Sequence, residues 1–301
     1  MVNGEIEADT CCASCGIAEI DDIKVVPCDD CDLVKYCSDE CRENHKSEHE
    51  DECKKRAAEL RDETLFKQPD GSHHGDCPIC SLPLPLDKEK STIMGCCSKV
   101  ICMGCRCANQ KREWEMRLNH RCPFCRESTP KTKEEYDKLV MKRIEMNDPA
   151  AMRIYAAEQR NKGNNRVAFE YFSKAAELGD AEAHNRLAWL YQKGQGVEND
   201  EEKSFHHLEE AAIGGHPNAR SILGCKEYSN GNVERAVKHF VIAAAQGEDN
   251  AIKILMEKFR EGEVGKDVLA AALRAQKAAV DATKSPQRVA ADEHYRKNGL
   301  H

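Results

Sequence analysis

Four pairs of potential metal ligands decide the fold at the start of this chain: Cys12-Ala-Ser-Cys15, Cys28-Asp-Asp-Cys31, Cys37-Ser-Asp-Glu-Cys41 and His49-Glu-Asp-Glu-Cys53. A C-x-x-C turn points both thiolates at one ion, and ligands four residues apart lie on one face of a helix. Seven cysteines and one histidine are enough for two closed tetrahedral zinc sites. The spacing leaves the pairing open, because sequential and interleaved use of the four pairs both produce two sites.

This string resembles the MYND zinc finger in every ligand and in the final x7-His-x3-Cys spacing. The resemblance implies a module over residues 12–53 whose binding is interleaved. One zinc would be held by Cys12, Cys15, Cys37 and Cys41, and the other by Cys28, Cys31, His49 and Cys53. Cys11 and His45 are expected to lie outside both sites. Because MYND fingers bind short proline-containing peptides, the resemblance also implies a peptide or protein partner.

A second cysteine cluster over residues 77–126 follows a charged segment and linker at residues 54–76. It consists of Cys77-Pro-Ile-Cys80, Cys96-Cys97, Cys102-x2-Cys105 and Cys122-Pro-Phe-Cys125. The cluster resembles a RING finger whose ligands are all cysteine. The resemblance implies one zinc on Cys77, Cys80, Cys102 and Cys105, and a second zinc on Cys122 and Cys125.

The remaining ligands of that second zinc are less regular. A usual RING has a histidine where this chain has Lys99. We expect the adjacent Cys96 and Cys97 to complete the site, with Cys107 and His120 as the alternatives.

Three further residues match positions that RING-type ubiquitin ligases use. Such ligases contribute no nucleophile and act by positioning a ubiquitin-conjugating enzyme. The resemblance implies that Ile79 and Pro123 contact this enzyme and that Arg126 bridges enzyme and ubiquitin. The alternative is that Ile79 and Pro123 only shape zinc loops and that Arg126 is a solvated charge.

The second half of the chain repeats itself. The motifs Ala175-Ala176-Glu-Leu-Gly179, Ala211-Ala212-Ile-Gly-Gly215 and Ala243-Ala244-Ala-Gln-Gly247 recur at spacings of 36 and 32 residues. Each unit contains two stretches with helical apolar periodicity, which predicts a solenoid of helix pairs. Paired alanines let helices approach closely, and the glycine ends the second helix of each pair.

These units resemble the Sel-like repeat, a relative of the tetratricopeptide repeat, over residues 148–285. The best match runs Ala183-x3-Leu187-Ala188-x2-Tyr191-x2-Gly194-x-Gly196. A connecting helix is expected within residues 127–147 and a C-terminal tail at residues 286–301.

Composition limits the cellular compartments and the classes of partner that fit this protein. The net charge of −8 and interspersed charges argue against nucleic acid as the main partner. No apolar run is long enough for a membrane span, and the acidic start lacks the apolar core of a signal peptide. Of the 18 cysteines, all but Cys225 lie in residues 11–125, a pattern that indicates metal ligands in a reducing compartment. A cytoplasmic or nuclear location is therefore expected.

The sequence thus predicts a multidomain protein with two small zinc-stabilised modules, an all-α helix-pair solenoid and four zinc ions. No catalytic residue or organic cofactor site stands out. The leading function is a RING-type ubiquitin ligase that selects substrates with its repeats, and the alternative is a non-enzymatic scaffold. The combination of modules resembles a protein family expanded in some algae.

Overall fold

The computed structural model describes residues 11–20 and 22–297. By its contacts the chain separates into two compact units, Met1–Lys67 and Gln68–His301. The acidic start, on which the prediction of no signal peptide depends, lies outside the described residues. So do residues 298–301 of the predicted tail.

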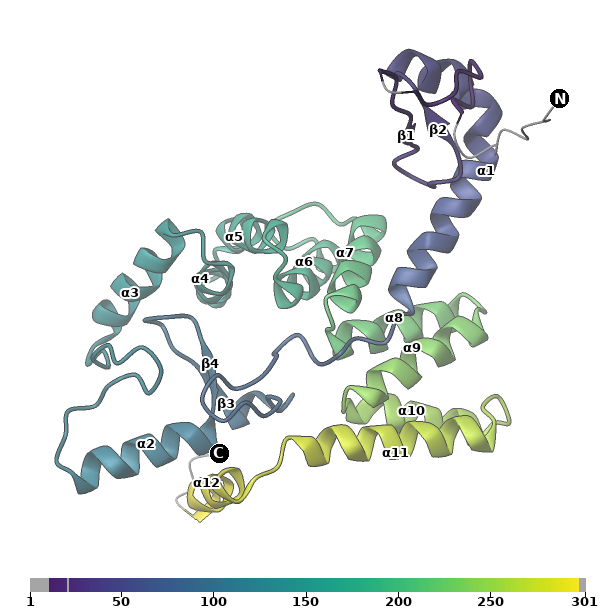
Figure 1. Cartoon of the computed structure of the whole chain (residues 1–301). Helices are drawn as coiled ribbons and strands as arrows, with labels where there is room; N and C mark the ends of the chain where they lie inside the picture. The colour runs from purple at the N-terminus through teal and green to yellow at the C-terminus, as the bar shows by residue number, and fades with distance from the viewer. Residues whose placement is uncertain (1–10, 21, 298–301) are drawn as a thin grey trace. The chain divides into compact units, whose positions relative to one another are not determined.

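The first unit is a short hairpin beside one long helix (Figure 1). Strands β1 (Val26–Pro27) and β2 (Lys35–Tyr36) pair antiparallel, with Val26 opposite Tyr36. Helix α1 (Asp39–Leu65) is capped by the preceding residue Ser38, whose side chain accepts a hydrogen bond from the N–H of Cys41. The buried core consists mainly of thiols and holds few aliphatic groups: Cys12, Val25, Cys28, Cys31 and Tyr36.

The second unit begins with another small cysteine-rich module. Strands β3 (Ser91–Ile93) and β4 (Val100–Cys102) pair antiparallel after the short 3-10 helix η2 (Lys88–Lys90). Helix α2 (Met103–Glu115) follows directly from β4. Its core contains Cys77, Leu84, Ile101, Cys102 and Cys105, so sulfur again fills the interior.

The rest of the second unit is the predicted solenoid. Helix α3 (Lys133–Glu145) lies within the expected connecting segment. Four helix pairs follow: α4 (Pro149–Asn161) with α5 (Asn165–Glu177), α6 (Ala181–Lys193) with α7 (Glu201–Ile213), α8 (Pro217–Ser229) with α9 (Val233–Ala245), and α10 (Asp249–Arg260) with α11 (Lys266–Ala282).

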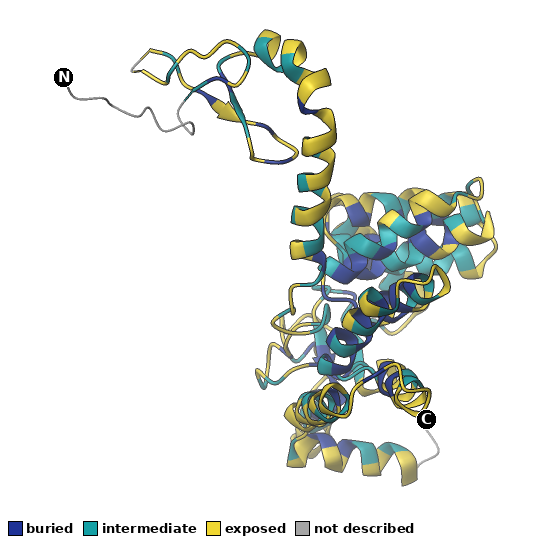
Figure 2. Cartoon of the chain, turned by 90° about the vertical axis from the view of Figure 1, so that its right-hand side faces the viewer, coloured by how far each residue is buried: buried dark blue, intermediate teal, exposed yellow. Residues whose placement is uncertain are grey.

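The repeat motifs act as the sequence predicts. The paired alanines are almost fully buried, and Gly179, Gly215 and Gly247 adopt positive φ after α5, α7 and α9. Buried residues line the facing sides of the repeat helices (Figure 2). The predicted fold class, zinc modules followed by a helical-hairpin solenoid, is confirmed.

A C-terminal helix packs against the cysteine-rich module of the second unit. Residues in the predicted tail form helix α12 (Pro286–Lys297), which packs against α2. The guanidinium of Arg288 donates to the carbonyl oxygens of Pro83 at 2.6 Å and Leu82 at 3.0 Å. Gly104 of α2 permits this approach, because a Cβ there would lie 2.9 Å from the side chain and 3.0 Å from the backbone of Arg288.

Candidate zinc centres

The first unit contains two groups of four ligand atoms. Cys12, Cys15, Cys37 and Cys41 form one group, with Sγ–Sγ distances of 3.5 Å from Cys15 to Cys37 and 3.6 Å from Cys37 to Cys41. Tetrahedral zinc with Zn–S bonds of about 2.3 Å requires sulfurs roughly 3.8 Å apart. The spacing therefore fits one shared ion.

The second group in this unit consists of Cys28, Cys31, His49 and Cys53. The Sγ atoms of Cys28 and Cys53 are 3.7 Å apart, and Cys31 Sγ lies 3.1 Å from His49 Nε2. His49 and Cys53 lie one turn apart on α1, as their spacing indicates. The structure brings the ligand pairs together in the interleaved order, and Cys11 lies outside both groups among the described residues.

The cysteine-rich module of the second unit also contains two groups. The first is Cys77, Cys80, Cys102 and Cys105. The second is Cys96, Cys97, Cys122 and Cys125, with Sγ–Sγ distances of 3.9 Å from Cys97 to Cys122 and 3.4 Å from Cys96 to Cys125. Adjacent cysteines reach one point because Ser98 follows them with a φ of 55°, and its N–H donates to Met94 O. Cys107 and His120 belong to neither group.

Four C-x-x-C turns share one backbone geometry. In each, the residue after the second cysteine has positive φ and donates its N–H to the carbonyl oxygen of the first cysteine. These residues and their N–O distances are Gly16 (2.9 Å), Asp32 (3.1 Å), Ser81 (2.8 Å) and Arg126 (3.0 Å). The shared turn therefore fixes both thiols of each of these four pairs on one side.

The thiols of these groups differ in acidity. Burial opposes ionisation of Cys12, but backbone N–H groups, first that of Cys15, outweigh it and lower its pKa to about 6. The same competition lowers the pKa of Cys77 to about 7. Contacts with Cys15 and Cys41 raise the pKa of Cys37 to about 12. The first group therefore combines a thiol of lowered pKa, Cys12, with a thiol of raised pKa, Cys37, whose deprotonation a bound cation would favour.

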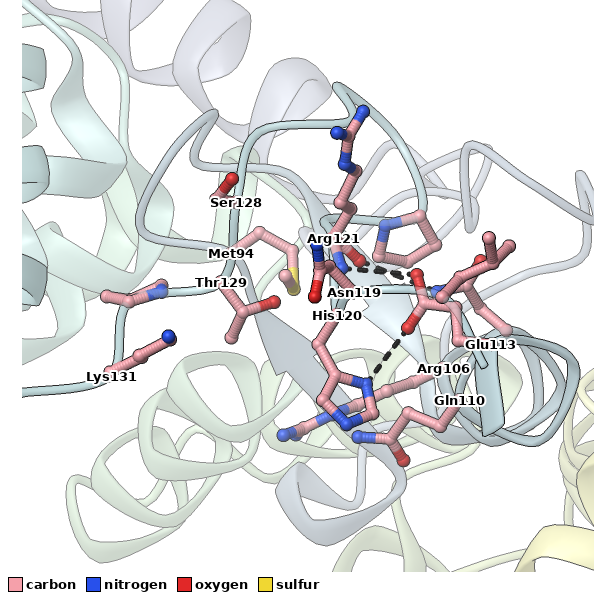
Figure 3. Close-up of a pocket in the computed structure, with 14 residues that line it drawn as sticks. Met94, Arg106, Gln110, Glu113, Asn119, His120, Arg121, Ser128, Thr129 and Lys131 are labelled. Atoms are coloured by element: carbon pink, nitrogen blue, oxygen red, sulfur yellow. Dashed lines mark hydrogen bonds and ion pairs between the residues drawn. The ribbon is translucent and has the colours of Figure 1, made fainter. Parts of the chain in front are cut away.

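Glu113 of α2 is a buried carboxylate that the sequence did not single out. Its Oε1 accepts from the N–H of Arg121 at 3.1 Å, and its Oε2 lies 3.1 Å from Nδ1 of His120 (Figure 3). Burial opposes its ionisation, but the hydrogen bonds from His120 and Arg121 outweigh that effect and lower the pKa of Glu113. Glu113 thus anchors the backbone immediately before Cys122.

We expect Glu113→Ala to lower the zinc affinity of the Cys96, Cys97, Cys122 and Cys125 group about 10–100-fold, the usual effect of losing an outer hydrogen bond at a metal site. Competition of the full chain with a chromophoric chelator measures this. Glu115→Ala, an exposed change on the same helix, is the control. Equal affinities in the two variants would contradict the role of Glu113.

The predicted partner-binding residues lie at the surface of this module. The Ile79 side chain is 42% exposed, and Arg126 is exposed beside the last cysteine. Pro123 is half-buried and lines a cavity of about 670 Å³ that His120 and Lys131 also border (Figure 3). Ile79 and Pro123 occupy the interior of C-x-x-C turns, so their backbones are fixed by the same turns as the ligands.

Comparisons with known proteins identify two parts of the chain. The MYND finger family matches residues 12–53, and the Sel1 repeat family matches residues 156–180, 181–216 and 219–248. The chain thus contains a MYND finger and Sel1 repeats, as the sequence predicts. These modules and the cysteine and histidine groups support zinc binding, with four sites possible.

One curated relative is chitin synthase regulatory factor 4 of Schizosaccharomyces pombe, 34% identical over 91 residues. The match covers 30% of this chain and 14% of the relative. A Sel1 repeat protein from Oxalobacter formigenes aligns with 28% identity and a TM-score of 0.43, covering 50% of this chain and 66% of the other. The protective antigen c5321 of uropathogenic Escherichia coli aligns with 22% identity and a TM-score of 0.39, covering 56% and 37%.

No helix among the described residues has both the length and the apolar character that crossing a membrane requires.

Proposed function

We propose that this protein is a zinc-dependent adaptor in the cytoplasm or nucleus whose cysteine-rich module at residues 77–126 acts as a RING-type ubiquitin ligase. The observation that carries the proposal is the order of the ligands around the two groups of that module. Of the four ligand pairs, the first (Cys77 and Cys80) and the third (Cys102 and Cys105) share one group, while the second (Cys96 and Cys97) and the fourth (Cys122 and Cys125) share the other. Two ions bound in this crossed order would hold Ile79, Pro123 and Arg126 on fixed loops.

The repeats are the proposed substrate-binding part. Aromatic rings of successive helices contact one another. Tyr155 meets Tyr171 edge to face, Phe169 meets Tyr191 edge to face, and Tyr191 stacks on His207. These side chains are half-buried rather than enclosed. Partly exposed aromatic groups on a rigid helical scaffold suit the binding of a protein or peptide.

A ubiquitin-discharge assay with a panel of conjugating enzymes tests the proposal. We expect Ile79→Ala to weaken recruitment of the conjugating enzyme, and Arg126→Asn to slow discharge while recruitment is nearly preserved. Asparagine tolerates the φ of 66° at position 126, so zinc content should be unchanged. Arg117→Asn, at another exposed arginine of positive φ outside the C-x-x-C turns, is the matched control and should discharge ubiquitin like the parent.

The second candidate is a non-enzymatic scaffold. It is favoured by the two matched families, since the MYND finger and Sel1 repeats both support protein interaction, and by a relative that is named as a regulatory factor. A scaffold predicts no discharge by the folded, zinc-loaded parent with any conjugating enzyme. That result would exclude the ligase and leave peptide and protein binding by the finger and the repeats as the function.

A further inference from the structure

A fifth group of metal-ligand side chains lies in the second unit, apart from the cysteines. It consists of His73 in the segment before the cysteine-rich module, Glu182 in the first turn of α6, and His216 immediately before α8. Their side chains are only 8%, 9% and 6% exposed. Glu182 Oε2 lies 2.9 Å from His216 Nε2 and 3.5 Å from His73 Nε2.

Hydrogen bonds and a ring stack hold His73 beside His216. Its N–H donates to Gly215 O at 2.9 Å, and its ring stacks on His216 with centroids 4.1 Å apart. Gln246 Nε2 donates to Gly71 O at 2.9 Å. Gly215 has a φ of 79°, and a Cβ there would lie 3.2 Å from Gly71 O. The segment is thus fixed across the loops between repeats by contacts that need no ion.

His216 is a departure from the other repeats. The residue before the first helix of each pair caps that helix, and in the other three pairs it is a carboxylate: Asp148, Asp180 and Glu248. At the corresponding place His216 Nδ1 accepts from the N–H of Ala219 at 3.2 Å. This orientation aims Nε2 at Glu182.

The buried ring of His73 is the unexplained feature. Its Nδ1 has no hydrogen-bond partner and its Nε2 has only the long 3.5 Å contact with Glu182 Oε2, although both nitrogens are shielded from solvent. A neutral imidazole always carries one N–H and one lone pair, and leaving these poorly paired in the interior is costly. A cation on Nε2 would satisfy the lone pair that faces the carboxylate.

We infer that His73, Glu182 and His216 form a fifth zinc site, which holds the ion through His73 Nε2, His216 Nε2 and Glu182 Oε2. Two imidazoles and a carboxylate are a usual zinc donor set with an open fourth position. Tetrahedral zinc with bonds of about 2.0–2.2 Å sets its ligand atoms roughly 3.3–3.6 Å apart. The 3.5 Å distance from Glu182 Oε2 to His73 Nε2 lies in that range, whereas the 2.9 Å distance to His216 Nε2 is that of a hydrogen bond and must widen by roughly 0.4 Å when the ion binds.

The surroundings leave room for the ion and its fourth ligand. Lys88 Nζ, at 3.1 Å, and the guanidinium of Arg186 both contact Oε1 of Glu182. Oε2 faces the two histidines, and the ion would replace the proton through which His216 Nε2 now contacts it at 2.9 Å. A cavity of about 450 Å³, lined in part by His73, His74 and Glu182, adjoins the group and can admit water as the fourth ligand.

The site must be weaker than the four cysteine-rich centres. Zinc on His216 Nε2 places the ring proton on Nδ1, which ends the hydrogen bond from Ala219. The two cations near Glu182 also disfavour a third. The fifth zinc is therefore the first that a limiting chelator removes, while the metal-independent contacts keep the segment around His73 on the repeats.

Metal analysis of the full-length protein, purified with zinc and freed of loosely bound metal by gel filtration, tests the inference. We expect five zinc ions per chain in the parent, four in His73→Gln and four in Glu182→Gln. His74→Gln, a change at the neighbouring histidine that lines the same cavity, should keep five. The first zinc released by limiting chelator should be missing from His73→Gln and present in His74→Gln.

Four zinc ions in the parent would overturn the inference without any variant, whatever the folding of the mutants. Five in the parent and five in a folded His73→Gln would place the extra ion elsewhere and would overturn it too. Neither result depends on ubiquitin transfer, so the ligase proposal stands or falls separately.

Discussion

Chelation of the zinc is expected to unfold residues 12–53 while the repeat helices keep their amide protection. The interior of the finger consists mainly of ligand residues. Helix α1, although it runs over 27 residues, buries only His49 and Leu65. Without metal, little apolar area remains to offset the conformational entropy of this segment.

The binding energy of zinc is large enough for its removal to unfold the finger completely. Each structural zinc contributes about 10–16 kcal/mol of apparent binding energy at pH 7, and that energy is folding energy. A whole domain is stable by only about 5–15 kcal/mol. Loss of two ions from the finger therefore exceeds any stability that it could retain.

The repeats should respond differently, because their cores contain no cysteine. One core joins Ala168, Phe172 and Leu187 with their neighbours, and another joins Phe240, Ala244 and Leu255 with theirs. Hydrogen–deuterium exchange of the full chain, before and after chelation, measures the two regions together. Re-addition of zinc is the control and should restore protection. Persistent protection of residues 12–53 in protein shown to hold no zinc would contradict the prediction.

The parts of this structure that the sequence predicts are those with local or periodic signals. C-x-x-C pairs and ligands four residues apart are set by one turn of backbone, so Cys28 and Cys31 could be assigned to one site without a structure. The repeats are similarly local, since the alanine pairs such as Ala211-Ala212 and the following glycine recur at nearly constant spacing.

The parts that the sequence does not predict depend on contacts between distant segments. Glu113 has the sequence context of an ordinary helix surface residue, and only the return of the chain at Arg121 buries it. Arg288 lies in a segment predicted as a tail, and its contacts are with the carbonyl oxygens of Leu82 and Pro83, about 200 residues earlier in the chain. No periodicity marks either residue.

The His73, Glu182 and His216 group illustrates the same limit. No local motif marks any of the three residues, and the repeat pattern places His216 where the other repeats have a helix-capping carboxylate. A signal did exist at that position. The helix caps of the other three pairs are Asp or Glu, and a histidine at the same position of the repeat indicates a separate role for that residue.

The pairing of ligands in the MYND finger determines which zinc centre is lost when a single cysteine is replaced. Cys37→Ser is expected to destroy the centre that contains Cys12 and Cys15, whereas Cys53→Ser is expected to destroy the centre that contains His49. The reason is the interleaved arrangement, in which Cys37 lies 3.5 Å from Cys15 and Cys53 lies 3.7 Å from Cys28. A serine hydroxyl is a poor substitute for thiolate on zinc, so each change should cost most of the roughly 10–16 kcal/mol of its own site.

Cobalt-substituted full-length protein distinguishes the two centres, because the thiolate-to-cobalt absorption reports the number of sulfurs bound. The spectrum lost from the parent on Cys37→Ser should be that of a four-thiolate centre. The spectrum lost on Cys53→Ser should be that of three thiolates and one imidazole. The two cysteine-rich centres of the other unit contribute equally to both variants and cancel in the difference.

Cys11→Ser, next to a ligand but outside both groups, should lose no absorption. Under sequential pairing both Cys37 and Cys53 belong to the centre with His49, so identical difference spectra for the two variants would refute the interleaved arrangement.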